Sequence, residues 1–132
     1  MTPSMPLHRS ADEQAVLAPL VALLGALGTR DAEAMRGTLL PGGHATIVRD
    51  GQVTLQPFDA FVERLSQPGA GRREEPVHDV LVHVAGELAV VWAPYRFLLD
   101  GSLQHVGTDV AQMVRVEGRW LIANLAFDMR PA

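Results

Sequence analysis

The spacing of apolar and polar positions predicts two helices near the start of the chain. Ser10 and Glu13 match a capping box, in which each side chain satisfies a free amide at a helix start. Apolar residues then recur every three or four positions, as one helical face requires. These residues are Leu17, Leu20, Val21, Leu24 and Leu27. Gly28 is expected to end this helix, and Asp31 to cap a short second helix that ends near Gly37.

Residues 44–65 carry the pattern of a hairpin followed by a third helix. Segments 44–49 and 52–55 flank Asp50-Gly51, a dipeptide typical of tight hairpin turns. Residues 58–65 place their apolar side chains on one helical face. These side chains are Phe58, Phe61, Val62 and Leu65. We therefore expect two short strands and one short amphipathic helix here.

The second half of the chain predicts four longer strands. A loop at 68–76 precedes them, and the turn dipeptides Asp100-Gly101 and Glu117-Gly118 separate the last three. The expected strands are 77–84, 88–99, 103–116 and 119–127. Helices gathered early and an antiparallel meander late indicate an α+β fold, with a curled antiparallel sheet packed on the N-terminal helices.

The length and composition favour one folded domain. The chain has 132 residues, of which 48% are hydrophobic and 20% charged, so it can bury a core. We expect a flexible tail at 1–9 and a single domain at 10–130. The apolar run at 15–28 is shorter than a membrane span and carries no signal-peptide pattern. We expect no membrane association and a cytoplasmic location.

The charge pattern narrows the classes of function. The net charge is −4, and the densest basic cluster, Arg72-Arg73, is followed at once by Glu74-Glu75. Nucleic-acid binding therefore lacks the basic surface that it needs. The chain has no cysteine, which excludes disulfides, thiol catalysis and cysteine metal sites. The sequence gives no reason to expect a metal or a cofactor.

Three motifs in the last third of the chain resemble a known group of proteins. They are Val91-Trp-Ala-Pro-Tyr-Arg-Phe97, His105-Val-Gly-Thr-Asp109 and Gly118-Arg-Trp-Leu-Ile122. With the order of elements, they resemble the nuclear transport factor 2-like superfamily, and within it small bacterial proteins described as SnoaL-like or putative lumazine-binding. The resemblance covers about residues 10–130. It implies a cone-shaped barrel of cystatin-like topology, a deep pocket between sheet and helices, and a homodimer. Some members are isomerases or dehydratases that use an Asp, His or Tyr.

Strand pairing across Glu117-Gly118 predicts which residues face that pocket. A two-residue turn pairs Val116 with Arg119 and places Asp109 opposite Ala126. The residues that then share the pocket face are His105, Asp109, Met113, Trp120, Ile122 and Asn124. The other face carries Val110, Val114, Leu121, Ala123, Leu125 and Phe127. Because both faces are apolar, we expect the outer one to form a homodimer.

The Asp100-Gly101 turn leaves two alternatives for the preceding strand. A loop of two or four residues puts Trp92 and Arg96 on the pocket face, whereas a loop of three residues puts Tyr95 and Phe97 there. We favour Trp92 and Arg96, and retain Tyr95 as a candidate. His44, which follows two glycines at a strand start, is a further candidate ligand contact.

Asp109 and His105 are the candidate catalytic residues. In an apolar pocket, Asp109 would have a raised pKa and could serve as a general base or ligand anchor; alternatively, it pairs with Arg96 or Asn124. Four residues of strand span about 13 Å, so His105 and Asp109 form two separate polar points unless a bulge at Gly107 re-aims one. His105 either contacts a ligand or is solvated.

We hypothesise a small-molecule-binding domain with an apolar pocket that takes an unidentified, partly apolar ligand. The first alternative is a cofactor-free isomerase or dehydratase with Asp109 as general base and His105 or Tyr95 as acid. The second is a dimerisation module without catalysis.

Overall fold

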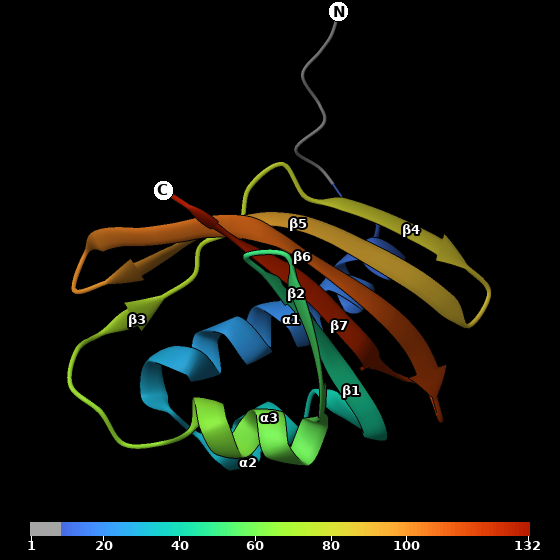
Figure 1. The fold of residues 1–132 in the computed structure, drawn as a ribbon. Coiled ribbons are helices and arrows are strands. Elements are labelled where there is room, and N and C mark those ends of the chain that lie inside the picture. Colours follow the sequence, from blue (N-terminus) through green and yellow to red (C-terminus); the bar gives the residue numbers. More distant parts are fainter. Residues whose placement is uncertain (1–8) are drawn as a thin grey trace, which may run out of the picture.

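Three helices lie against the concave side of one curled sheet (Figure 1). This computed structural model describes residues 9–132, so all of the predicted tail except Arg9 falls outside the described residues. The helices are α1 (Ala11–Thr29), α2 (Ala32–Arg36) and α3 (Phe58–Leu65). The strands are β1 (Leu39–Arg49), β2 (Gln52–Pro57), β3 (Arg73–Glu74), β4 (Leu81–Ala85), β5 (Leu88–Leu99), β6 (Ser102–Val116) and β7 (Arg119–Pro131). The predicted α+β class is confirmed.

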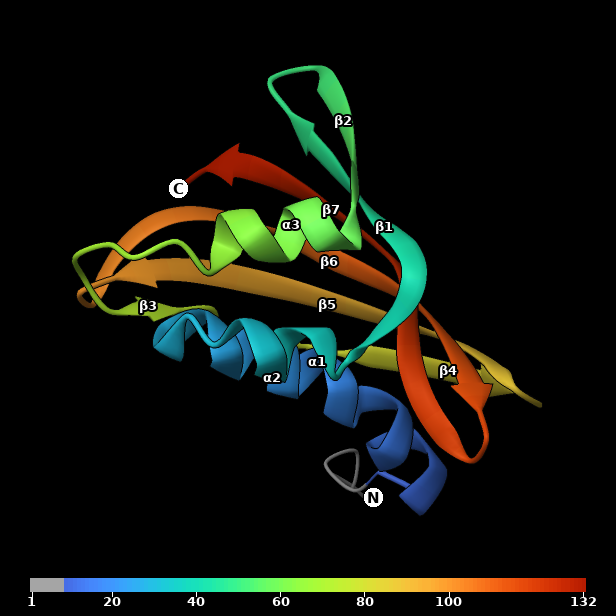
Figure 2. The same cartoon turned by 90° about the horizontal axis from the view of Figure 1, so that it is seen from below.

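The sheet has the order β2-β1-β7-β6-β5-β3, and β4 also pairs with β5. The pairs are antiparallel except β1 and β7, which run parallel. The first and last strands of this order are not paired with each other among residues 9–132, so the described sheet curls without closing into a barrel. Figure 2, seen from below, shows all three helices in front of the sheet, with the β1–β2 hairpin extending past α3.

Local signals placed most of the elements correctly. The capping box at the start of α1 is formed: the Ser10 hydroxyl accepts from the Glu13 amide, and the Glu13 carboxylate accepts from the Ser10 amide. Asp31 caps α2 as expected. The helix end was misjudged, because α1 continues to Thr29 and Arg30 takes the left-handed conformation that was expected at Gly28.

The three predicted hairpin turns are formed. Asp50-Gly51, Asp100-Gly101 and Glu117-Gly118 each have positive φ at both residues, the conformation of a two-residue turn whose twist matches its strands. Each turn fixes the register of the strands only as far as the first bulge, and a bulge follows two of the three turns.

Extra residues in β6 and β7 move several side chains to the other face. Beyond the turn at Asp100-Gly101, Leu98 pairs with Leu103 but Phe97 pairs with His105, so Gln104 is unopposed. Tyr95 and Phe97 consequently face inward. The expectation that Trp92 and Arg96 face the pocket is wrong: Trp92 is 49% exposed on the outer side, and Arg96 is exposed as well. The prediction of a two-residue loop was right. The bulge that follows it exchanges the two faces of β5 relative to β6, so the predicted inward side chains point outward.

A second bulge changes the pairing of β6 with β7. Met113 pairs with Ile122 as expected, yet Gln112 pairs with Asn124, so Ala123 is extra. Asp109 therefore lies opposite Phe127 and not Ala126. The bulge turns Leu125 and Phe127 inward, where the cavity is, and puts Asn124 on the outer side beside the exposed Gln112. The predicted faces of Asn124, Leu125 and Phe127 were therefore wrong, whereas those of Asp109 and His105 were right.

The inner and outer sides of the sheet differ in burial. Directly paired residues share a face, and one inner row, Val82, Val91, Ala111, Leu125 and Ala45, is buried from end to end. This row packs on the buried face of α1, which includes Leu20 and Leu23. By length and composition α1 could also cross a membrane, but that apolar face lies in the core.

Candidate functional site

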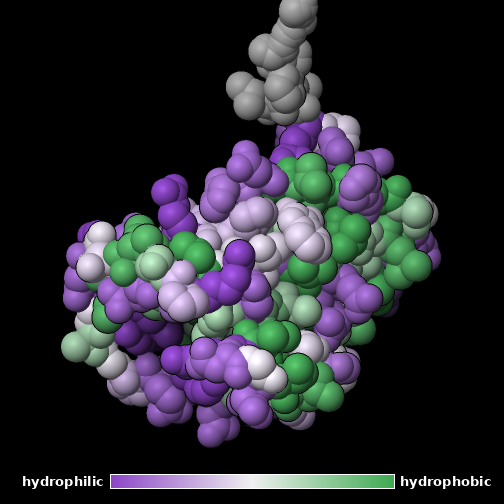
Figure 3. All heavy atoms as spheres, turned by 45° about the horizontal axis from the view of Figure 1, so that its top comes forward, coloured by the Kyte–Doolittle hydropathy of each residue, from purple (hydrophilic) through white to green (hydrophobic). Residues whose placement is uncertain are grey.

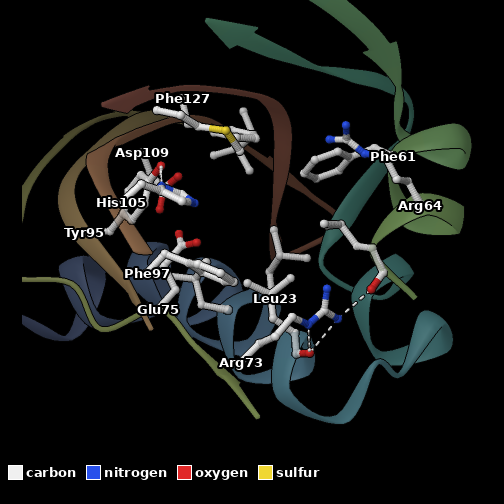
Figure 4. A pocket seen from close by; sticks show the side chains of 15 residues that line it. Leu23, Phe61, Arg64, Arg73, Glu75, Tyr95, Phe97, His105, Asp109 and Phe127 are labelled. Carbon is white, nitrogen blue, oxygen red and sulfur yellow. Dashed lines mark hydrogen bonds between the residues drawn. The ribbon is translucent and has the colours of Figure 1, made fainter. Parts of the chain in front are cut away.

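A cavity of about 220 Å³ lies between the sheet, α1 and α3 (Figure 4). Most of its wall is apolar, and its polar side chains are few. The apolar side chains are Leu23, Leu24, Leu27, Phe61, Leu65, Phe97, Leu125, Phe127 and Met129; the polar ones are Arg64, Arg73, Glu75, Tyr95, His105 and Asp109. A cavity of about 150 Å³ holds benzene, so this one has room for a single substituted ring.

The candidate residues from the sequence divide into three groups. His105, Asp109 and Tyr95 line the cavity. Met113, Trp120 and Ile122 are on the inner side but belong to the packed core, because the sheet and helices meet there without space between them. Trp92, Arg96, Asn124 and His44 lie on the outer side of the sheet, away from the cavity. The expectation that these last four contact a ligand in the pocket is therefore wrong.

Asp109 is the most deeply buried polar residue of the site. It is 2% exposed, and its Oδ2 atom has no hydrogen-bond partner among the described residues. Burial raises the pKa of Asp109 from its ordinary 3.8 to about 6, and the neighbouring Glu75 carboxyl group partly offsets this rise. An unsatisfied buried carboxylate oxygen costs stability, and a ligand that donates a hydrogen bond to it would recover that cost.

Glu75 forms a carboxyl pair with Asp109. It follows β3, and Figure 4 shows its carboxyl group turned into the cavity beneath Asp109. Burial raises the pKa of Glu75 well above its ordinary value, and the charge of Asp109 raises it further. Two carboxyl groups this close do not both ionise readily, so Glu75 is the partner that keeps a proton when Asp109 has lost its own.

The Tyr95 side chain lies over Gly107 of the neighbouring strand and fixes the orientation of the His105 ring. Its hydroxyl donates to the Asp128 carbonyl at 2.8 Å and lies 3.3 Å from Nδ1 of His105. Since the single hydroxyl proton goes to the carbonyl, Nδ1 carries the hydrogen and donates to Tyr95, which leaves Nε2 as an acceptor. The His105 ring also stacks on Phe97, with centroids 4.9 Å apart.

The electrostatics keep His105 neutral and Tyr95 protonated. Burial lowers the pKa of His105, and the positive charge of Arg49 lowers it further. Burial and then the charges of Glu75 and Asp109 raise the pKa of Tyr95. The site thus combines an acid, a carboxylate and a neutral imidazole in one apolar cavity, a set that can take up and return a proton.

Sequence reasoning missed three polar residues of the wall, namely Arg64, Arg73 and Glu75. Arg73 and Glu75 are two positions apart on an extended segment, so they share a face, and that alternation was the available signal. It was obscured because the segment lies in a Gly- and charge-rich stretch that was taken for a surface loop. Among residues 9–132, no group of three or more His, Asp or Glu side chains is arranged to hold a metal ion.

The family comparison covers most of the chain. A family model described as putative lumazine-binding matches residues 11–128. No curated protein gives a significant match.

Solved structures of similar shape come from several bacteria. An NTF2-like protein of unknown function from Shewanella baltica is 14% identical with a TM-score of 0.72, over 95% of this chain and 100% of that one. A Nostoc punctiforme protein of unknown function with a cystatin-like fold is 9% identical, with a TM-score of 0.76 over 94% and 95%. A putative dehydratase of the NTF2-like family from Streptomyces avermitilis is 17% identical, with a TM-score of 0.74 over 92% and 97%. At these identities the likeness concerns the fold.

Proposed function

The chain belongs to the putative lumazine-binding family of the NTF2-like superfamily, and on this premise we propose that it binds a small, partly apolar molecule in its cavity. The observation that carries this proposal is Asp109, whose Oδ2 atom is buried in an apolar cavity and has no hydrogen-bond partner within residues 9–132. A ligand with one apolar ring and a hydroxyl or ring N–H would bury the ring and donate to that oxygen.

A second candidate function is cofactor-free proton transfer within the same cavity. It is favoured by the raised pKa of Asp109, about 6, beside a Glu75 that keeps its proton. Asp109 would accept a proton from the ligand and Glu75 would donate one. Tyr95 is already committed to the Asp128 carbonyl, so in this proposal it orients His105 and is not the acid.

Replacing Asp109 by asparagine tests both functions with one variant. The wild-type protein should bind p-cresol about tenfold more tightly than toluene, because only the cresol hydroxyl can donate to the carboxylate. We expect Asp109→Asn to remove most of that preference in calorimetric titrations. If the cavity catalyses proton transfer, exchange of the α-hydrogens of an enolisable ketone in deuterated water should fall at least about 100-fold in the variant.

Met113→Leu is the matched control for this variant. Met113 is fully buried on the same strand face but belongs to the packed core, so its replacement should leave the cresol preference unchanged. Failure of both cresol and toluene to bind the wild-type protein would contradict the binding proposal. Undiminished exchange in Asp109→Asn would contradict the role of Asp109 as base.

We further propose that the outer side of the sheet joins two copies of the chain. Leu81, Trp92 and Leu55 lie in one row across the sheet and are 56%, 49% and 64% exposed. Figure 3 shows hydrophobic side chains gathered over part of this side. Apolar area of this kind is normally covered by a partner, and a twofold axis would place the row against its own copy.

Sedimentation equilibrium should therefore give twice the chain mass of 14.3 kDa. Introducing a charge by Trp92→Glu should shift the protein to the monomer, because an unpaired carboxylate would be buried in the interface. Val21→Glu is the control, since Val21 is equally exposed but lies on α1. A monomeric wild-type protein, or equal dissociation by both variants, would contradict the proposed interface.

A further inference from the structure

Arg73 presents one unused nitrogen at the cavity. Its Nε and Nη2 atoms donate to the Leu27 carbonyl near the end of α1, at 3.0 and 2.7 Å, and Nη2 also donates to the Leu65 carbonyl at the end of α3, at 2.6 Å. These bonds hold the guanidinium in one orientation. No hydrogen bond of the described residues uses Nη1, which Figure 4 shows turned away from both carbonyls. Two N–H groups are therefore free at a fixed place in the wall.

No acidic side chain neutralises the charge at this end of the cavity. The ion pairs among the described residues do not include Arg73 or Arg64, and both line the cavity. A neighbouring hollow shares Arg64 and Met129 with the cavity and is also lined by Arg49 and Asp50, which pair with each other. Although the chain has a net charge of −4, Arg64 and Arg73 therefore leave this end of the cavity positive. A concave, low-dielectric surface of one sign concentrates ions of the opposite sign.

The distance between the positive and the acidic end of the cavity sets a minimum length for a ligand that contacts both. Arg73 and Glu75 are two positions apart on extended chain, so their backbones are about 7 Å apart, and Figure 4 shows their charged ends turned apart. A ligand that touches both ends must carry polar groups at least that far apart. A two-carbon acid is too short, whereas one ring with polar groups in para positions is long enough.

We propose that the ligand is a single-ring organic acid, whose carboxylate pairs with Arg73 and Arg64 and whose hydroxyl or N–H reaches Glu75 and Asp109. This inference rests on the proposed binding function and adds the charge of the ligand to it. The fixed, unused edge of Arg73 and the exposed side chain of Arg64 on the same cavity offer donors for the two oxygens of a carboxylate. A phosphate, with more oxygens and more charge, would leave acceptors unpaired here.

Three probes separate the inference from the function on which it rests. They are 4-hydroxybenzoate, its neutral isostere 4-hydroxybenzamide, and p-cresol. We expect the wild-type protein to bind the acid at least about tenfold more tightly than the amide, because the interaction is between charged partners. Equal affinities for acid and amide would overturn the inference and leave the binding function standing. Failure of all three to bind would overturn both.

Variants at the two arginines test the assigned residues. Arg73→Met should abolish the preference for the acid while p-cresol still binds. Because this change also removes three hydrogen bonds, Arg64→Gln is the second variant. The Arg64 side chain makes no hydrogen bond among residues 9–132, and its loss should reduce the preference several-fold. Arg72→Gln is the control, since Arg72 points outward and pairs with Glu74. An equal loss in Arg72→Gln would show a general charge effect and overturn the assignment.

Phenyl phosphate tests the other kind of anion. Weaker binding than that of 4-hydroxybenzoate would support the carboxylate assignment. Tighter binding that depends on Arg73 would overturn it in favour of a phosphorylated ligand.

Discussion

Replacing Gly107 with alanine is expected to destabilise the protein by about 3 kcal/mol, which is typical of overpacking at a site that cannot give way. A Cβ atom at this position would lie 2.6 Å from both the ring and the hydroxyl of Tyr95, and it would also overlap the Asp128 carbonyl. Tyr95 is 1% exposed, and its hydroxyl is bonded to the same Asp128 carbonyl, so the ring cannot shift away without breaking that bond. Urea denaturation monitored by circular dichroism measures the loss.

Displacement of Tyr95 should also disturb the cavity. The hydroxyl that holds His105 would lose its place against the Asp128 carbonyl, so ligand affinity should fall together with stability. Gly25→Ala is the matched control: nothing lies within 4 Å of a Cβ there, and alanine is favoured over glycine inside a helix by about 0.5–1 kcal/mol. A Gly107→Ala protein as stable as wild type would show that the ring does not pack across the glycine.

The second large effect is a loss of stability as pH rises. In the folded protein the pKa of Asp109 is about 6 against an ordinary 3.8, and the pKa of Glu75 is raised well above 4.5. Raised carboxyl pKa values mean that the folded state binds more protons than the unfolded state, so their stabilising effect is complete below about pH 4 and is lost as pH rises through 6 and beyond. For Asp109 alone the loss is about 3 kcal/mol.

The double variant Asp109→Asn/Glu75→Gln should remove this pH dependence. Relative to wild type, the free energy of unfolding of the double variant should increase steadily as pH rises from 4 to above 7, because only the wild type loses the protons of Asp109 and Glu75. Glu63→Gln, an exposed acid on α3, should retain the wild-type slope. A wild-type protein whose stability, relative to the double variant, rises between pH 4 and 7 would contradict the raised pKa values.

The sequence predicted elements and turns well because these depend on neighbouring residues. The capping box at Ser10, the cap at Asp31 and the Asx-Gly turns are local motifs, and each is formed. The parallel pairing of β1 with β7 depends on residues some 80 positions apart, for which the sequence carries no comparable signal. The extension of β1 back to Leu39, through Pro41-Gly42-Gly43, follows from that pairing and was missed for the same reason.

The candidate site could be predicted only up to the bulges. Asp109 and His105 alternate along one strand, so their common face followed from geometry. An extra residue at Gln104 or Ala123 exchanges the two faces of a paired strand. Neither position is a glycine or a proline, so the sequence carries no signal for a bulge there. For this reason Tyr95 and Phe97, not Trp92 and Arg96, came to line the cavity. Glu75 was missed because its partner, Asp109, is distant in sequence.

The two tryptophans of the chain lie on opposite sides of the same sheet. Trp92 is half-exposed on the outer side, whereas Trp120 is 9% exposed on the inner side, with Arg115 5.4 Å from its ring. Their fluorescence should therefore have distinct origins: a blue-shifted component from the interior and a red-shifted, quencher-accessible component from the outer surface. Because neither ring lines the cavity, quenching by acrylamide would monitor what covers the outer side of the sheet without labels and independently of the ligand.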